Sequence, residues 1–213
     1  MKSKTHPQDR NQHNFQAVML DQTLLKTPFK VHTNWVVITG SACTGKTTLI
    51  NMLADKGFPI IQETARLYID QEIAKGQSIE HIIKNAQTQL AIIKMQIQAE
   101  NEENVKFSEL AFLDRGLPDS LTFYRYNGLN PNAILMKCFQ KRYACVFILN
   151  RLPLKLDGAR IPDENFLHYL DQWLEKDYRS LGYQVVRVPV MPPEERLDFI
   201  LNTLSQQRVG IQT

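Results

Sequence analysis

The segment GSACTGKT at residues 40–47 constrains the fold more than any other part of the chain, because it fits the pattern G-x-x-x-x-G-K-[ST] at every fixed position. It follows an apolar run at residues 35–39 and precedes a stretch with helical periodicity, the strand–loop–helix context that the pattern requires. Such a turn presents successive backbone N–H groups to phosphate oxygens, and its glycines permit a close approach. We therefore predict a phosphate loop whose nucleotide-binding residues are Gly40, Ser41, Ala42, Cys43, Thr44, Gly45, Lys46, Thr47 and Thr48.

Two residues of this loop have distinct predicted roles. The Lys46 ammonium is placed to bridge the terminal phosphates, and the Thr47 hydroxyl is placed to ligate Mg²⁺ at the helix N-terminus. The alternative is a strand–turn–helix that matches the pattern by chance. Cys43, inside the turn, is interpreted as a small space-filling residue, the alternative being a thiol whose pKa is lowered by the helix N-terminus.

Short apolar runs alternate with longer helical stretches from residue 35 to 207, which predicts an α/β fold with a parallel sheet wrapped by helices. The predicted strands are Trp35–Thr39, Pro59–Gln62, Ala111–Asp114, Cys145–Leu149 and Gln184–Val188. A long helix is expected to begin at Ser78, because the apolar residues that follow it fall on one helical face. We predict one domain over residues 34–208, preceded by a partly mobile extension over 1–33 in which Ala17–Leu25 forms a short docking helix.

Composition and charge exclude several classes of protein. No apolar run approaches the length of a membrane span. The net charge of +3 resides entirely in residues 1–33, while the other 180 residues carry 20 basic and 20 acidic side chains, so a general nucleic-acid binder is not expected. The basic extension is read as a solvated tail, with a membrane or nucleic-acid arm as the alternative. Three cysteines without metal or redox spacing predict reduced thiols and a cytoplasmic location.

Carboxylates and arginines follow the second and third predicted strands, at the edge of the sheet where ligands of open parallel sheets bind. Asp114 is the predicted Mg²⁺ carboxylate. Glu63 is the candidate base for an attacking hydroxyl, and it is also a candidate substrate-binding residue together with Arg66, Arg115 and Asp119. Each assignment has a structural alternative: a surface Glu63–Arg66 pair, a turn cap at Asp114, or an Arg115–Asp119 pair.

A cationic loop follows the fourth predicted strand and contains the remaining catalytic candidates. Arg160 is the first candidate and Arg151 the second for stabilising the charge that spreads over a transferring phosphoryl group, the alternative being a solvated basic loop. The chain has no Asn-Lys-x-Asp motif for guanine, which favours adenine. Four aromatic side chains are candidates to stack on an acceptor ring or to belong to the core, namely Tyr68, Phe123, Tyr124 and Tyr126.

With these motifs in place, the chain resembles a group of small P-loop ATPases and kinases. These are related to the nicotinamide riboside kinase domain of bifunctional NAD-biosynthesis regulators and to TRPL-translocation-defect-like nucleotide-binding proteins. The matching pieces span about residues 35–204: the loop at 40–47, 63–66, Asp114-Arg115 with Asp119, 157–160 and 188–196. The resemblance implies a nucleoside- or nucleotide-kinase-like fold with strand order 2-3-1-4-5, ATP with Mg²⁺ as ligand, and a lid around Arg160.

These observations lead to a hypothesis of ATP- and Mg²⁺-dependent phosphotransfer to a small-molecule acceptor such as a nucleoside or nucleotide. In this hypothesis Lys46, Thr47 and Asp114 position the nucleotide, Glu63 is base or acceptor anchor, and Arg160 supplies charge. A nucleotide-gated protein that binds a protein or a phosphoinositide is the rival from another class, and a simple nucleoside triphosphatase is the third alternative. The acceptor and the oligomeric state stay open at this point.

Overall fold

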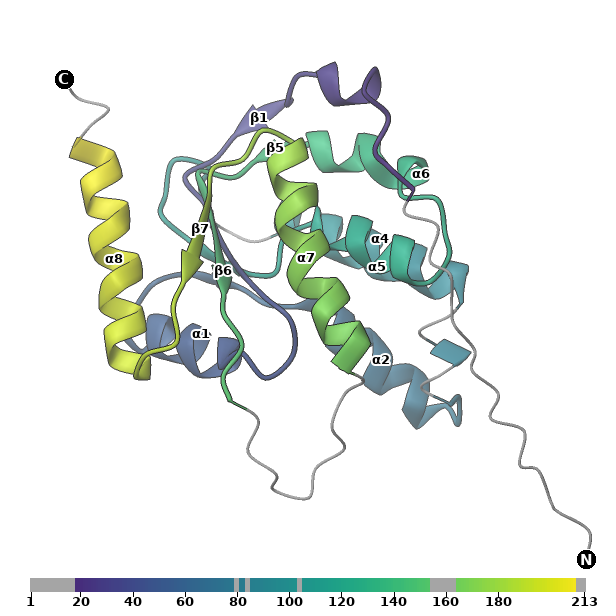
Figure 1. Cartoon of the computed structure of the whole chain (residues 1–213), viewed down its shortest axis with the longest axis horizontal. Helices are drawn as coiled ribbons and strands as arrows, with labels where there is room; N and C mark the ends of the chain where they lie inside the picture. The colour runs from purple at the N-terminus through teal and green to yellow at the C-terminus, as the bar shows by residue number, and fades with distance from the viewer. Residues whose placement is uncertain (1–17, 79–80, 83–84, 103–104, 154–163, 210–213) are drawn as a thin grey trace, which may run out of the picture.

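The structure, a computed structural model, describes residues 18–78, 81–82, 85–102, 105–153 and 164–209. Its centre is a parallel sheet of five strands in the order β3-β4-β2-β6-β7 (Figure 1). These strands are β2 (Val36–Thr39), β3 (Ile60–Ile61), β4 (Phe112–Asp114), β6 (Cys145–Leu149) and β7 (Val185–Val188). Numbered along the chain as five, they have the order 2-3-1-4-5, so the predicted α/β fold and the predicted order are confirmed.

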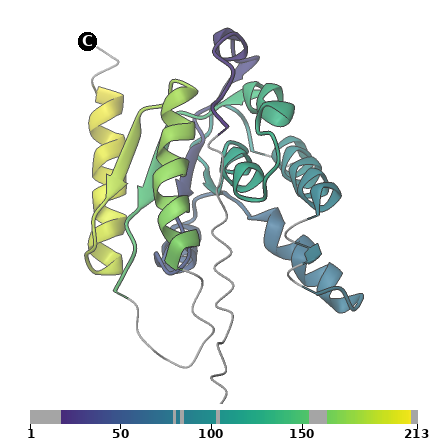
Figure 2. The ribbon, with the colours of Figure 1, turned by 45° about the vertical axis from the view of Figure 1, so that its right-hand side comes forward.

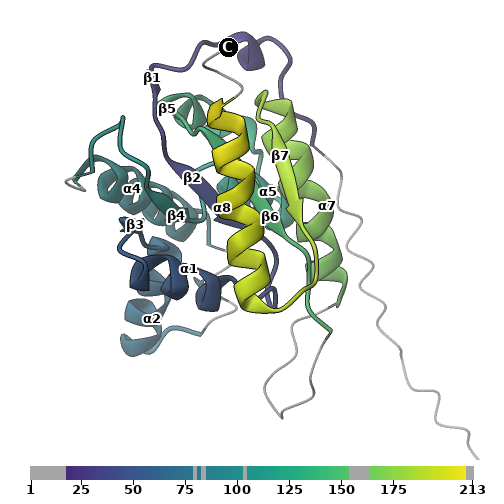
Figure 3. The same ribbon diagram turned by 90° about the vertical axis from the view of Figure 1, so that its left-hand side faces the viewer.

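Helices cover both faces of this sheet. Figures 2 and 3 show α8 (Pro193–Val209) and α1 (Lys46–Asp55) on one face and α7 (Glu164–Ser180) on the other. The second face also carries α4 (Ala86–Glu102) and α5 (Asp119–Tyr126), and α2 (Thr64–Ala74) packs against α4. Because alternate strand residues point to opposite faces, Val36 and Ile38 belong to one core and Val37 to the other. Burial on both faces explains why the strands read as continuous apolar runs.

Two further short strands, which the sequence analysis did not predict, form a separate parallel pair. They are β1 (Val31–His32) and β5 (Lys141–Arg142). The remaining short elements are the 3-10 turns η1 (Leu24–Lys26) and η2 (Met136–Phe139) and the helix α6 (Asn132–Leu135). None of the described helices is both long enough and apolar enough to pass through a lipid bilayer.

The described part of the predicted extension, residues 18–33, packs on the body. Leu20 is buried, and the backbone carbonyl of Val18 accepts a hydrogen bond from Arg125 Nε at 2.8 Å. The predicted helix over Ala17–Leu25 is wrong for the described residues, which form only the turn η1. The carboxylate of Asp21 accepts bonds from the backbone and hydroxyl of Thr23, and this local turn competes with a helix. The division at residue 33 stays a prediction.

The prediction that one long helix begins at Ser78 is also wrong. The helix α4 begins at Ala86, because Asn85 precedes it and its side-chain oxygen accepts a hydrogen bond from Gln87 N at 2.8 Å. Ser78 does cap a separate turn, since its hydroxyl accepts a bond from His81 N at 3.3 Å.

Candidate active site

The phosphate loop (residues 40–47) joins the end of β2 to the start of α1, as its sequence predicts. Three of its residues have positive φ: Gly40 at 153°, Cys43 at 59° and Gly45 at 77°. A side chain at Gly40 would stand 3.0 Å from the carbonyl of Leu149, so glycine is needed there for space as well as for conformation. Within the described residues, the backbone N–H groups of 42–45 donate no hydrogen bond. Free donors at a helix N-terminus fit a polyphosphate.

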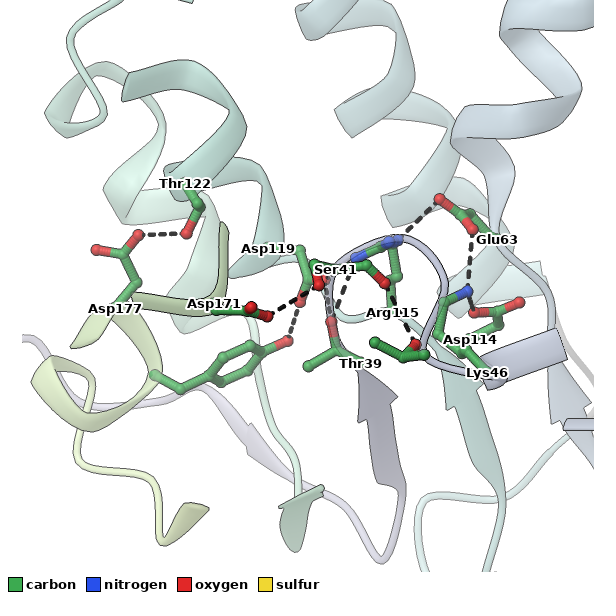
Figure 4. A network of polar contacts seen from close by, with 12 residues as sticks. Thr39, Ser41, Lys46, Glu63, Asp114, Arg115, Asp119, Thr122, Asp171 and Asp177 are labelled. Atoms are coloured by element: carbon green, nitrogen blue, oxygen red, sulfur yellow. Dashed lines mark hydrogen bonds and ion pairs between the residues drawn. The ribbon is translucent and has the colours of Figure 1, made fainter. Parts of the chain in front are cut away.

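The Lys46 side chain lies between two carboxylates that come from neighbouring strands. Its ammonium contacts Asp114 at the end of β4 and lies 3.2 Å from Glu63 Oε2 just after β3 (Figure 4). Burial raises the pKa of Asp114 and outweighs the opposing attraction of Lys46. Burial would also raise the pKa of Glu63, but the charges of Arg115 and Lys46 lower it overall. The tertiary structure thus brings together three residues predicted as catalytic, Lys46 from the phosphate loop and Glu63 and Asp114 from the strand ends.

Arg115 is the next member of this polar network. Its φ is 69°, an uncommon conformation for a residue with a side chain, and its backbone N–H bonds the Ile38 carbonyl at 3.1 Å. The guanidinium donates to Glu63 at 2.9 Å and to Asp119 at 3.0 Å. Although burial would lower its pKa, the charges of Glu63 and Asp119 raise it overall.

Both carboxylate oxygens of Asp119 accept hydrogen bonds from protein donors. Oδ2 accepts from Thr39 at 2.5 Å as well as from Arg115, and Oδ1 accepts from Tyr178 on α7 at 2.6 Å. The pair with Arg115 is the structural alternative that the sequence left open. Arg66, by contrast, is exposed and forms no ion pair with another described residue, while Glu63 faces Lys46 and Arg115 instead.

A cavity of about 160 Å³ opens beside this network. Glu63, Arg115 and Asp119 line it on the side of the phosphate loop. Its other walls carry the apolar and aromatic side chains of Ile69, Ile92, Phe123, Tyr126 and Phe166, with the amides of Gln89 and Gln96. Two of the four candidate aromatics therefore line the cavity, whereas Tyr124 is buried in the core. Sequence reasoning missed the residues from α4 and α7, since nothing local marks which face of a helix borders a cavity.

Arg151 lies near the loop but is engaged by α7. Its guanidinium contacts Glu164 at 2.7 Å and Asp171 at 2.6 Å. Asp171 also accepts a hydrogen bond from Ser41 of the phosphate loop at 2.8 Å (Figure 4). Sequence reasoning missed this contact because the partners are 130 residues apart. The other arginine candidate, Arg160, lies outside the described residues.

Comparison with known families gives one match, an AAA domain (AAA_28) over residues 35–196. The chain belongs to this AAA-domain family. The matched region contains the phosphate loop, Glu63, Asp114 and Arg115. A comparison with curated protein sequences gives no significant match.

Solved structures place this AAA-domain chain among P-loop kinase folds. It superposes on the NadR protein in complex with NR with a TM-score of 0.59 and 22% identity, covering 73% of this chain and 45% of that one. The match thus spans less than half of the NadR chain. Thymidylate kinase from Candida albicans gives a TM-score of 0.57 and 12% identity over 83% and 92% of the two chains. Deoxyadenosine kinase from M. mycoides with bound dATP gives a TM-score of 0.53 and 16% identity over 80% of this chain and 99% of that one. The predicted group of small P-loop proteins is confirmed.

Proposed function

We propose that this chain is a kinase that transfers the γ-phosphoryl group of ATP to a hydroxyl group of a small, ring-bearing acceptor. The position of Glu63 carries the proposal. Its carboxylate lies 3.2 Å from the ammonium of Lys46 in the phosphate loop, and it also lines the aromatic cavity. A phosphoryl donor in the loop and an acceptor in the cavity would therefore meet beside one carboxylate, which is the proximity that phosphoryl transfer needs.

The nucleotide end of this site would be formed by residues 40–48. The free N–H groups of 42–45 would bind phosphate oxygens, with Lys46 at the terminal phosphates. Mg²⁺ fits the Thr47 hydroxyl, exposed in the first turn of α1, together with Asp114. When bound, the ion would neutralise charge on the β- and γ-phosphates. No group of three His, Cys, Asp or Glu side chains suited to a metal occurs in the described residues, so phosphates and water would complete the shell.

At the acceptor end, the charges of the cavity favour an acceptor without a phosphate group. Arg115 is the only cationic side chain among the described residues that line it, and its guanidinium already contacts Glu63 and Asp119. An entering phosphate would meet two carboxylates and no free cation. Phe123, Tyr126 and Phe166 offer apolar faces to a ring. A nucleoside therefore fits this cavity better than a nucleotide.

In this proposal the charged residues divide phosphate binding and proton transfer among them. Glu63 orients the acceptor hydroxyl and accepts its proton as the new P–O bond forms. Lys46 would exchange its carboxylate partners for the γ-phosphoryl oxygens, and Asp114 would help to hold Mg²⁺. Arg160 is proposed to stabilise the transferring group. Arg151 would have to leave Glu164 and Asp171 to do the same.

The test is acceptor-dependent release of ADP from ATP and Mg²⁺, with matched panels of nucleosides and nucleoside monophosphates. We expect turnover with a nucleoside, its loss in Lys46→Ala, and a fall in kcat of about 100-fold or more in Glu63→Gln with nearly unchanged nucleotide affinity. Glu102→Gln, the same chemical change on an exposed carboxylate at the end of α4, is the control.

Three outcomes would contradict the proposal. ADP release that no acceptor stimulates would indicate a simple nucleoside triphosphatase. Nucleotide-dependent capture of a protein or phosphoinositide with background turnover would favour a binding protein. Turnover with monophosphates alone would overturn the assignment of an uncharged acceptor.

A further inference from the structure

Arg196, in the first turn of α8, is bound in an unusual way. It is buried, with 3% of its surface exposed, yet its guanidinium donates only to backbone carbonyls. These carbonyls belong to Thr44 in the phosphate loop at 2.5 Å, Asn150 after β6 at 3.1 Å and Pro189 after β7 at 3.0 Å. One side chain thus ties together three segments at the carboxyl edge of the sheet.

The charge of Arg196 has no carboxylate partner among the described residues. Other arginines differ: the buried Arg125 is paired with Asp177 at 2.8 Å, and the half-buried Arg115 is held by Glu63 and Asp119. Burial lowers the pKa of Arg196, and no neighbouring acid opposes that effect. A buried charge without a counter-ion is costly. The position of this charge beside the phosphate loop therefore suits a bound anion that balances it.

The contact with Thr44 also acts on the loop's own donors. The Thr44 carbonyl belongs to the same peptide unit as the Gly45 N–H, which is free within the described residues. A cation bound to the carbonyl polarises the peptide and strengthens the N–H as a donor. A side chain added at Gly45 would lie 3.7 Å from the guanidinium, which places that charge directly behind the loop.

We propose that Arg196 is a positioning residue for the nucleotide, which fixes the phosphate loop through Thr44 and whose positive charge is balanced by the bound polyphosphate. This rests on the nucleotide binding of the proposed function. Because the effect is electrostatic, its size grows with the number of phosphates. A unit charge at about 10 Å, at an effective dielectric constant of about 20, changes a binding constant by roughly tenfold.

The experiment measures the affinities of AMP, ADP, ATP and inorganic tripolyphosphate by calorimetry, in EDTA so that metal does not offset phosphate charge. It compares the full-length wild type with Arg196→Gln, Arg196→Lys and the control Arg142→Gln. Arg142 likewise donates to a carbonyl, that of Gly182 at 2.7 Å, but it lies in β5, outside the central sheet. We expect Arg196→Gln to weaken the binding of ATP and tripolyphosphate by roughly tenfold more than it weakens the binding of AMP.

The lysine variant separates charge from geometry. We expect Arg196→Lys to have a lower Tm yet to keep the wild-type gain in affinity from AMP to ATP, and Arg142→Gln to match the wild type. An equal loss of affinity for all four ligands in Arg196→Gln, or no loss, would overturn the proposal. The loss from a purely structural role would not depend on the number of phosphates. If Arg196→Gln does not fold, loss of the AMP-to-ATP gain in Arg196→Lys overturns it instead. Failure of the wild type to bind any of the four ligands, both in EDTA and with Mg²⁺ added, would instead refute the proposed function itself.

Discussion

Replacing Asp119 by asparagine distinguishes a positioning residue from a direct substrate ligand. Asp119 is 3% exposed, and its two oxygens accept bonds from Thr39, Arg115 and Tyr178 at 2.5, 3.0 and 2.6 Å. An asparagine has only one acceptor oxygen. Either its NH₂ group faces the guanidinium of Arg115, or it faces the buried hydroxyl of Tyr178, which must then turn its own proton away from any partner.

The expected loss of stability follows from the interactions that the substitution removes. Each hydrogen bond to a charged group contributes about 1.5–3 kcal/mol, and breaking a buried ion pair from one side costs about 3–5 kcal/mol. Arg115 keeps Glu63 as a partner, so we expect Asp119→Asn to lower the free energy of unfolding by about 3–4 kcal/mol. Tyr178→Phe removes only one donor and should cost about 1–3 kcal/mol.

Urea unfolding followed by circular dichroism, with the acceptor screen on the same variants, is the assay. We expect both variants to lose stability in the stated order, and Asp119→Asn to lose activity because Arg115 loses one of its two carboxylate partners. The reasoning is refuted if Asp119→Asn unfolds within about 1 kcal/mol of the wild type while KM for the acceptor alone rises. In that case the carboxylate would be a substrate ligand, as the sequence analysis proposed.

Three further predictions concern the cavity and the core. Gly116→Ala should lower the free energy of unfolding by about 1–3 kcal/mol in urea, because the new methyl would stand 2.7 Å from the Tyr178 hydroxyl; wild-type stability would contradict this. Phe123→Ala should raise KM for ring-bearing acceptors while leaving the calorimetric affinity for ATP unchanged, and an equal loss for both would remove this residue from the acceptor side. Glu100→Gln should change the pH dependence of stability, because burial raises the pKa of Glu100 above its unfolded value. The stabilising contribution is then fully present below that unfolded pKa and is lost as pH rises through the folded pKa, so the wild type should lose stability relative to the variant between pH 5 and pH 8. Parallel urea midpoints at the two pH values would contradict this.

The phosphate loop and the sheet could be predicted because their signals are local. The loop needs its glycines, lysine and threonine at fixed spacing, and buried parallel strands need continuous apolar runs bounded by turns. Glu63 and Asp114 followed from their places just after β3 and at the end of β4, since the carboxyl ends of parallel strands share one edge. The strand order came from the resemblance to known P-loop proteins, because periodicity does not say which strands are neighbours.

Local sequence patterns gave wrong predictions where a side chain forms a contact other than the one that the pattern implies. Asn85 interrupts the helix that the apolar stripe predicts from Ser78, and Asp21 forms a turn where the pattern predicts a helix. The place of Arg66 one turn beyond Glu63 predicts a contact between them, yet Glu63 contacts Lys46 and Arg115 instead.

The sequence by itself therefore determined that this chain is a parallel α/β protein with a phosphate loop and carboxylates at its edge. Only the tertiary structure decided which charges neutralise one another. Asp171 reaches Ser41 across 130 residues and Arg196 reaches Thr44 across 152, so no spacing rule links them. Whether an arginine is paired or left with its charge uncompensated depends on the groups that folding brings to it, and electrostatic energy depends on distance in space rather than along the chain.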